Sequence, residues 1–368
     1  MSFRQPKQFR SPLTLGMSRI LTIVGARPQF IKAAAVSHVL RRHHDEQLVH
    51  TGQHYDDNMS ALFFRQLGIP EPDHHLEIGS GPHGRQTGRM MEAIEQLMLD
   101  DRPDWMLLYG DTNSTLAGAL AAAKLHVPVA HVEAGLRSFN RQMPEEINRV
   151  LTDHVSTLLF CPSAVAVANL AAEGLTKGVH EVGDVMADSL QLAAVAANND
   201  SVVQSLGLQP DTYALVTVHR AENTDNASHL TAILTAIDAM PFPVVFPVHP
   251  RTRAVITANG WQPGANVRLI EPQGYIDMVA LLAGARVVCT DSGGLQKEAY
   301  WLAKPCVTLR TETEWVETVS SGWNVLAPPT LANITELAVR ATAPATRPAL
   351  YGEGGASERI AEIIGTAA

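Results

Sequence analysis

Residues 127–149 read VPVAHVEAGLRSFNRQMPEEINR, and they are the best guide to the architecture of the chain. The apolar run 127–130 predicts a buried β-strand, and Pro144 followed by two acidic residues predicts the start of a helix. A parallel α/β sheet hides its strands and offers ligands only their carboxyl ends. The His, Glu and Arg side chains that follow this strand therefore predict a functional site.

The same alternation of short β-rich runs and helical patterns extends along the whole chain, which is typical of βαβ units in a parallel sheet. Strands are predicted at 19–24, 46–51, 105–109, 127–132 and 157–161, and again at 213–218, 244–248, 267–270, 286–290 and 306–309. Helices are predicted at 30–41, 86–99, 115–124, 185–198, 230–239 and 295–303. The expected fold class is α/β, with two Rossmann-like domains facing a cleft.

The domain boundary is predicted near residues 183–184, where a helical pattern follows Gly183 and Asp184. We expect a disordered leader at 1–17, a first Rossmann-like domain at 18–183 and a second at 184–352. A final helix at 353–368 is expected to pack back on the first domain. With 368 residues, of which 46% are hydrophobic, the chain can bury the cores of two domains.

Composition narrows the classes of partner. A formal net charge of -9 argues against a nonspecific nucleic-acid surface, which needs basic side chains to displace phosphate counterions. Cys161, Cys289 and Cys306 are too few and too scattered for a disulfide framework, which favours a reducing cytoplasm. No apolar run reaches the roughly 18 residues of a membrane span, so no membrane partner is expected.

Polar side chains follow most of the predicted strands, where a parallel sheet presents them at one edge. Individually, each fits an ordinary helix cap or a satisfied histidine, but their shared position favours a ligand site. These residues are Arg27, Gln53, His54, Asp111, His131, Glu133, His219, Arg220, His249, Arg251, Asp291 and Ser292.

Two loops are candidates for holding phosphate. The turn at 25–28 enters a helix, so we expect free backbone amides there, with Arg27 and Lys32 as mobile cations. Ser292, Gly293 and Gly294 offer the same geometry in the second half, although a simple N-cap also explains them. Glu298 follows on the predicted helix and would be repelled by phosphate, so it is expected to accept hydrogen bonds from ribose hydroxyls. The inferred ligand is a nucleoside diphosphate.

Carboxylates supply the second part of the prediction. His131 and Glu133 are expected to share one face of a strand, with Asp111 ending the neighbouring strand and Glu145 beginning a helix. General acid/base chemistry at carbon needs such groups on opposite sides of the reacting atom. A helix N-terminus also attracts acidic residues, and this alternative applies most strongly to Glu146.

A metal site is not predicted. The adjacent pairs His43-His44 and His74-His75 diverge on any regular element and are interpreted as exposed surface. The H-x-E pattern at His131 resembles a zinc deaminase signature, but its P-C-x-x-C partner is missing.

Eight ordered segments resemble the non-hydrolysing UDP-N-acetylglucosamine 2-epimerases, a family with the two-domain glycosyltransferase-B architecture. They are GARPQFIK (25–32), TGQH (51–54), YGDTNSTLAG (109–118), HVEAGLRS (131–138), PEEINR (144–149), VHRAEN (218–223), PVHPR (247–251) and TDSGGLQKEA (290–299). The resemblance implies that UDP leaves as the C2 proton is removed, giving a 2-acetamidoglucal to which UDP adds back after reprotonation from the other face. The product would serve surface polysaccharide synthesis.

The resemblance also implies roles for particular residues. The expected catalytic residues are Asp111, Glu133, Glu145 and His219. Tyr275 would lie near the uracil and Glu298 would take the ribose. The other expected substrate-binding residues are Arg27, Lys32, Gln53, His54, Arg149, His249, Ser292, Gly293 and Gly294. No cofactor or metal is implied, and a homodimer is suggested.

Two departures from the better-known members leave the substrate and its regulation open. Where those members have an acidic and Arg-Pro run, this chain has TEWVE at 313–317. That resembles a branch acting on UDP-2,3-diacetamido-2,3-dideoxyglucuronate, whose carboxylate would need Arg137, Arg141 or Arg310. UDP-N-acetylglucosamine remains the first expectation. Asp56 replaces the second Gln of a regulatory substrate site, so such a site is in doubt. More distant alternatives are a UDP-sugar glycosyltransferase, a hydrolysing epimerase and a non-catalytic nucleotide-sugar sensor.

Overall fold

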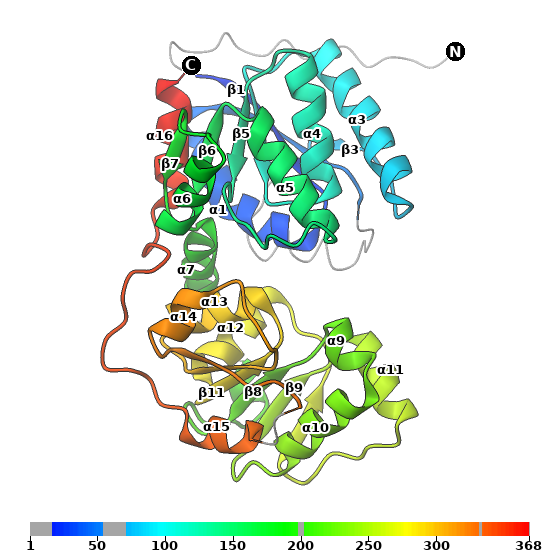
Figure 1. The fold of residues 1–368 in the computed structure, drawn as a ribbon, viewed down its shortest axis with the longest axis vertical. Helices are drawn as coiled ribbons and strands as arrows, with labels where there is room; N and C mark the ends of the chain where they lie inside the picture. Colours follow the sequence, from blue (N-terminus) through cyan, green and yellow to red (C-terminus); the bar gives the residue numbers. More distant parts are fainter. Residues whose placement is uncertain (1–16, 54–70, 198–201, 331–332, 368) are drawn as a thin grey trace. The chain divides into compact units, whose positions relative to one another are not determined.

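The computed structural model describes residues 17–53, 71–197, 202–330 and 333–367, which form two compact units (Figure 1). Among these residues, unit 1 comprises 17–53, 71–182 and 355–367, and unit 2 comprises the described residues from 183 to 354. Each unit contains one sheet in which all strand pairs are parallel.

The sheet of unit 1 has seven strands in the order β3-β2-β1-β4-β5-β6-β7, which is the doubly wound Rossmann order with one added edge strand. Its strands are β1 (Arg19–Val24), β2 (Asp45–His50), β3 (His74–His75), β4 (Trp105–Tyr109), β5 (Val129–Val132), β6 (Leu158–Cys161) and β7 (Val179–Glu181). The strands β1, β4, β5 and β6 are mostly apolar and almost wholly buried, as expected for a sheet covered on both faces.

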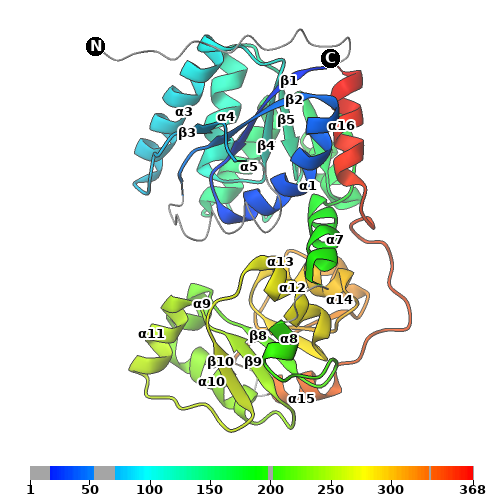
Figure 2. The same ribbon diagram turned by 180° about the vertical axis from the view of Figure 1, so that it is seen from behind.

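Helices cover both faces of this sheet. They are α1 (Arg27–His43), α3 (His83–Asp100), α4 (Asn113–Lys124), α5 (Pro144–Val155), α6 (Ala164–Ala172) and α16 (Ala356–Thr366). The helices α3, α4 and α5 lie side by side on one face (Figure 1), and α1 and α16 lie together on the other (Figure 2). Met90, Ile94 and Met98 project from α3 at helical spacing into a core shared with β1, β4 and α4.

The C-terminal helix α16 belongs to unit 1, although the whole of unit 2 precedes it in the chain. It buries Ile360 and Ile364, and Arg359 Nε donates to the carbonyl of Val182 at 2.9 Å. His44 lies against it, with Nε2 3.2 Å from the Ala361 carbonyl oxygen. The interpretation of His44 as an exposed histidine is therefore wrong, because the α1 to β2 turn on which it lies is covered by α16.

The sheet of unit 2 has six strands in the order β10-β9-β8-β11-β12-β13, so it repeats the Rossmann order. The strands are β8 (Ala214–Thr217), β9 (Val244–Pro247), β10 (Val267–Ile270), β11 (Val287–Thr290), β12 (Cys306–Thr308) and β13 (Asn324–Leu326). The helices are α7 (Val185–Ala197), α8 (Val202–Ser205), α9 (Ala221–Thr224), α10 (Ala227–Asp238), α11 (Pro250–Ala258), α12 (Tyr275–Gly284), α13 (Gly293–Trp301), α14 (Val316–Ser320) and α15 (Ile334–Arg340).

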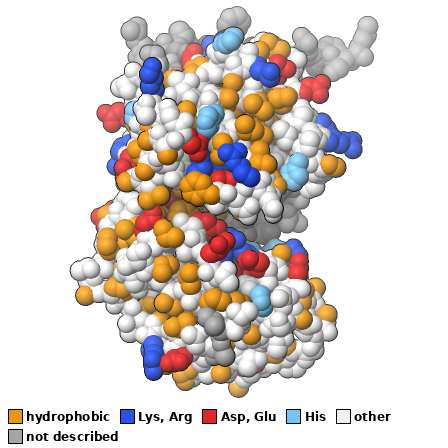
Figure 3. Space-filling model, viewed as in Figure 1, with side chains coloured by type: hydrophobic (Ala, Val, Ile, Leu, Met, Phe, Trp, Pro, Cys, Tyr) orange, Lys and Arg blue, Asp and Glu red, His pale blue; other side chains and the backbone are white. Residues whose placement is uncertain are grey.

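The predicted α/β class with two parallel sheets is confirmed, and every predicted strand is present. The short edge strands β3, β7 and β13 were not predicted, since two or three residues are too few to show a period. Within the described residues, no helix is long and apolar enough to cross a membrane. Figure 3 shows hydrophobic side chains among charged ones on the face of unit 1 that carries α5 in Figure 1.

Candidate functional site

The carboxyl edge of the unit 1 sheet brings Lys32 and Glu133 into an ion pair. Lys32 comes from the second turn of α1 and Glu133 follows β5, and their side chains are only 13% and 8% exposed. Gly110, at the end of β4, lies beside the pair: a Cβ there would be 3.3 Å from Glu133 Oε2 and 3.7 Å from Lys32 Nζ. Glycine at this position leaves room for the pair, and Lys32 is not the mobile cation that was expected.

Glu133 adopts a left-handed backbone conformation, with φ +69°. Residues other than glycine rarely do so, and such conformations gather at functional sites because the surrounding structure enforces them. The turn also separates Glu133 from His131, which lies inside β5. The expectation that the two side chains share a strand face is therefore wrong: β5 ends at Val132 and the chain turns before Glu133.

A second pair of charges joins β4 to α5. Arg149 forms an ion pair with Asp111, and its other terminal nitrogen lies 3.2 Å from Glu146. Asn148 Nδ2 donates to the Asp111 carbonyl at 2.9 Å, so consecutive residues of α5 hold both the side chain and the backbone of Asp111. The Asp111 side chain is 31% exposed, which leaves it accessible to a ligand.

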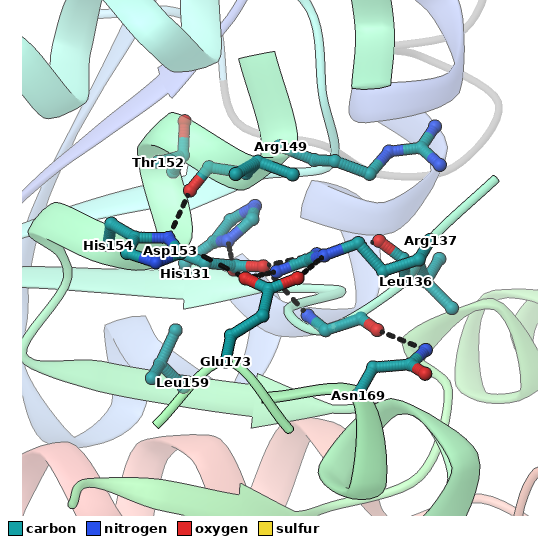
Figure 4. Close-up of polar contacts among 12 residues, drawn as sticks. His131, Leu136, Arg137, Arg149, Thr152, Asp153, His154, Leu159, Asn169 and Glu173 are labelled. Atoms are coloured by element: carbon teal, nitrogen blue, oxygen red, sulfur yellow. Dashed lines mark hydrogen bonds and ion pairs between the residues drawn. The ribbon is translucent and has the colours of Figure 1, made fainter. Parts of the chain in front are cut away.

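His131 and Asp153 are fully buried beneath this edge (Figure 4). His131 Nδ1 is 2.7 Å from Asp153 and its Nε2 is 2.7 Å from the Gly110 carbonyl oxygen. Arg137 donates to Asp153 at 2.7 Å and forms a two-pronged pair with Glu173. Burial alone would raise the pKa of Asp153, but the contacts with His131 and Arg137 outweigh it and lower that pKa. The cluster ties β5 and α5 to the end of β4.

Glu145 and Glu146 behave differently although they are adjacent in the first turn of α5. Glu146 is 1% exposed and accepts hydrogen bonds from Ser138 N (2.9 Å), Ser138 Oγ (2.9 Å) and Phe139 N (3.0 Å). Burial would raise the pKa of Glu146, but these bonds and Arg149 lower it. Glu145 is exposed to solvent. Glu146 therefore anchors the loop before α5, while Glu145 remains available for chemistry.

The loop after β1 does not leave its amides free. Gln29 Oε1 accepts from Gly25 N at 2.8 Å and from Ala26 N at 3.1 Å, and Gln29 Nε2 donates to the Tyr109 carbonyl at 2.8 Å. The prediction of a phosphate cradle at these two amides is wrong, because a side chain from the next turn fills it. Arg27 lies in the first turn of α1, and its side chain is outside the described part of the structure.

Gln53 is buried, and its side-chain oxygen accepts from Ser114 N at 3.0 Å and from Ser114 Oγ at 2.7 Å. This contact joins the end of β2 to the start of α4. The predicted role of Gln53 in binding substrate stays a prediction, alongside this structural one. His54 and Asp56 lie outside the described residues.

In unit 2, Asp291 organises the loop after β8. It is fully buried and accepts from the backbone amides of His219 (3.1 Å) and Arg220 (3.0 Å) and from Asn223 Nδ2 (3.0 Å). His219 Nδ1 lies 3.3 Å from the same carboxylate, and the imidazole remains 47% exposed. Burial lowers the pKa of His219, Arg220 and His249 lower it further, and Asp291 opposes them.

The start of α13 also lies at this edge of the unit 2 sheet. Ser292 Oγ caps the helix by accepting from Leu295 N at 3.5 Å, which leaves its hydrogen free to donate. At Gly293, a Cβ would meet Trp315 Nε1 at 3.4 Å, Glu314 Oε2 at 3.7 Å and Arg220 Nη2 at 3.8 Å. At Gly294 the same position faces open space. A helix N-terminus flanked by cations and small residues suits an anion.

Three other predicted residues have clear surroundings in unit 2. Tyr275 begins α12 with its hydroxyl beside the Glu298 carboxylate; burial, and then Glu298, raises the pKa of Tyr275. Both side chains are more than nine-tenths buried. His249 is exposed and caps α11, with Nδ1 accepting from Arg251 N at 3.3 Å. In this structure His249 is therefore an ordinary helix cap, which was the alternative to a ligand-binding role.

Asp153, Gln29 and Glu314 were missed by the sequence reasoning. Asp153 lies inside a helical pattern, where nothing in the local sequence distinguishes a buried polar anchor from a surface residue. Gln29 had a local signal, because a Gln three residues after the N-cap is typical of a helix cap. Glu314 lies in the TEWVE segment. That segment differs from the better-known members, but the sequence alone did not show where it lies in the fold.

The chain matches the family model described as UDP-N-acetylglucosamine 2-epimerase over residues 38–365. It is 51% identical to the UDP-2,3-diacetamido-2,3-dideoxy-D-glucuronate 2-epimerase of Pseudomonas aeruginosa, over 94% of this chain and 99% of that protein. A UDP-N-acetylglucosamine 2-epimerase homolog of Methanococcus maripaludis is 50% identical over the same shares. A crystal structure of the Methanocaldococcus jannaschii UDP-GlcNAc 2-epimerase with UDP-GlcNAc and UDP is similar, with TM-score 0.83 and 39% identity over 94% of this chain and 99% of that one.

Proposed function

Because the chain belongs to the UDP-N-acetylglucosamine 2-epimerase family, an isomerase family of glycosyltransferase-B architecture, we propose that it interconverts UDP-N-acetylglucosamine and UDP-N-acetylmannosamine. The observation that carries this proposal is the edge of the unit 1 sheet, where Glu133 and Asp111 are each held by a cation. Two oriented carboxylates are what proton transfer at a carbon atom requires.

The reaction eliminates UDP as the C2 proton is removed and then adds UDP back to the 2-acetamidoglucal after reprotonation from the other face. C2 is weakly acidic because no carbonyl flanks it, so departure of UDP must supply much of the driving force. Asp111, Glu133 and Glu145 are assigned to proton transfer. Lys32 neutralises and orients Glu133, and Arg149 does the same for Asp111.

The nucleotide is assigned to unit 2. His219, Ser292 and the amide groups at Gly293 and Gly294 are proposed to stabilise the charge that develops on the departing diphosphate. Glu298 and Tyr275, already side by side, are proposed to take the ribose and the uracil. Arg27 remains a proposed phosphate ligand.

The test is incubation with UDP-N-acetylglucosamine followed by NMR of the products. The proposal predicts a mixture of UDP-N-acetylglucosamine and UDP-N-acetylmannosamine. Free N-acetylmannosamine with UDP would instead show a hydrolysing epimerase, and sugar transfer to an added acceptor would show a glycosyltransferase. UDP-N-acetylglucosamine that binds and stays unchanged would leave either a sensor or an epimerase of another UDP-sugar, and incubation with the second candidate substrate separates the two.

A second candidate substrate is UDP-2,3-diacetamido-2,3-dideoxyglucuronate, favoured by the 51% identity to the Pseudomonas aeruginosa enzyme. Its carboxylate needs a cation. Arg137 is bound to Asp153 and Glu173, and Arg310 is bound to Glu314. Arg141 is exposed, and no ion pair to it is found within the described residues. If the glucuronate is the substrate, Arg141→Ala should raise its KM about tenfold or more while leaving activity on UDP-N-acetylglucosamine unchanged.

We also propose that the chain is a cytoplasmic homodimer. Ile147 and Leu151 lie one turn apart on the outer face of α5 and are 41% and 44% exposed, so a second copy would bury an apolar stripe. Light scattering of the Ile147→Glu, Leu151→Glu double variant should show monomers where the parent chain shows dimers. An unchanged mass would place the interface elsewhere.

A further inference from the structure

Trp315 carries a hydrogen-bond donor that the described structure leaves unused. Its indole Nε1 is buried from solvent and has no hydrogen-bond partner within the described residues. The nitrogen faces the start of α13, where it lies 3.4 Å from the position a Cβ would take at Gly293. A buried donor without an acceptor costs free energy, so it calls for a partner such as a water, an ion or a ligand.

The indole ring is held so that this donor keeps its direction. Lys297 Nζ lies 3.9 Å from the centre of the Trp315 ring, and Lys297 is itself buried and paired with Asp184. The Tyr351 ring meets Trp315 edge-on at 5.5 Å and 80°. A ring packed against a cation and a second aromatic side chain cannot turn its N–H away without losing both contacts.

Charges around the donor favour an anionic acceptor. Arg220 Nη2 and Glu314 Oε2 lie 3.8 Å and 3.7 Å from the same point at Gly293. The Glu314 carboxylate would repel an anion, but Arg310 binds it at 2.8 Å and Arg220 lies 3.6 Å from it. Two guanidinium groups and the helix N-terminus therefore outweigh one carboxylate.

We propose that Trp315 Nε1 donates a hydrogen bond to a phosphate oxygen of the UDP moiety at the start of α13, which makes Trp315 a specificity-determining residue for the diphosphate. The proposal rests on the proposed function, which assigns the nucleotide to this place. The structure supplies the rest: a buried donor and the Arg220 guanidinium near Gly293 at the helix N-terminus, with Arg310 neutralising the Glu314 carboxylate beside them.

The test is calorimetric titration of UDP and of uridine into the full-length chain and its Trp315→Phe variant. Phenylalanine keeps an aromatic face for Lys297 and removes the N–H together with the rest of the pyrrole ring, and uridine binding reports any loss of packing. We expect the Kd of UDP to rise about tenfold, as for loss of a hydrogen bond to a charged group, and the Kd of uridine to stay the same. The matched control is Trp301→Phe, because the Trp301 N–H already donates to the Gly352 carbonyl at 3.3 Å. It should leave both constants unchanged.

An unchanged Kd for UDP in Trp315→Phe would overturn the inference, as would an equal loss of uridine binding, which indicates a damaged site. A parent chain that fails to bind UDP would overturn the proposed function as well, so the two failures are distinguishable. Indole N–H spectra give a second readout, since the chain has five tryptophans and Trp315→Phe identifies one signal. UDP should shift that signal downfield and uridine should not; equal shifts with both would contradict the proposal.

Discussion

At the scale of single residues, the two glutamates at the start of α5 have different roles: one is structural and the other is proposed to be catalytic. Glu146 satisfies three donors of the loop before the helix, whereas Glu145 is exposed. Glu146→Gln should lower the free energy of unfolding by about 2 kcal/mol, because buried donors lose charged acceptors. Glu145→Gln should change it by less than about 0.5 kcal/mol but reduce kcat about a hundredfold or more.

Urea unfolding and steady-state kinetics on both variants check this pair of expectations. Equal stability losses would mean that Glu145 has a structural partner when the chain folds. A Glu145→Gln enzyme with normal kcat would remove Glu145 from the catalytic residues.

His219 should couple nucleotide binding to a proton. Its lowered pKa keeps the imidazole neutral at neutral pH. The Asp291 carboxylate, 3.3 Å from Nδ1, favours the tautomer with its proton on Nδ1, which leaves a lone pair on Nε2. Nε2 can donate to a diphosphate only after it is protonated. Binding of UDP should therefore take up a proton and tighten as pH falls from about 8 to about 6.5. Calorimetry in buffers of different ionisation enthalpy measures the uptake, and His219→Gln should abolish it; uptake that persists in the variant would assign the proton to another group.

At the scale of elements, Asp153 joins β5 to α5 through His131 and Arg137. Its pKa is lowered in the folded chain, so its contribution to stability is present above the unfolded value near 3.9 and is lost as pH falls below it. Asp153→Asn should destabilise the chain by about 3 kcal/mol at pH 7. The difference between parent and variant should shrink below about pH 4. A difference that stays constant down to about pH 3 would contradict the assignment.

The sequence predicts elements better than it predicts their polar anchors. Apolar runs such as the one at β4 identify strands because burial on both faces leaves a local signal. The amides at Gly25 and Ala26 were expected to be free, yet the Gln29 side chain, at the third position of the helix, accepts from both as a local cap. The turn at Glu133 could not be predicted from the sequence either, since a positive φ at a glutamate follows from its surroundings rather than from its own preference.

At the scale of the whole molecule, the first unit needs the last helix. The helix α16 packs on α1 and buries Ile360, Ala361 and Ile364. A chain ending at residue 354 should lose several kcal/mol of stability in unit 1, at about 25 cal/mol per Å² of apolar surface exposed. Urea unfolding should show that loss for a tryptophan of unit 1, Trp105, with a smaller change for Trp323 of unit 2. An unchanged midpoint for Trp105 would show that α16 is dispensable.

The two-sheet architecture could be predicted because each half repeats the same alternation of strands and helices, and eight motif segments occur in order. The substrate could not be predicted in this way, since the choice between the two candidate sugars depends on a few cationic side chains. Arg137 was a candidate on sequence alone, and only the fold shows that its guanidinium is committed to Asp153 and Glu173.

The central claim is that this chain inverts C2 of a UDP-2-acetamido sugar through proton exchange with solvent. The direct measurement is ¹H NMR in D₂O during turnover of UDP-N-acetylglucosamine or of UDP-2,3-diacetamido-2,3-dideoxyglucuronate. The account predicts a C2-inverted UDP-sugar that carries deuterium at C2. An inverted product that retains its original C2 proton, or no inversion of either sugar, would contradict it.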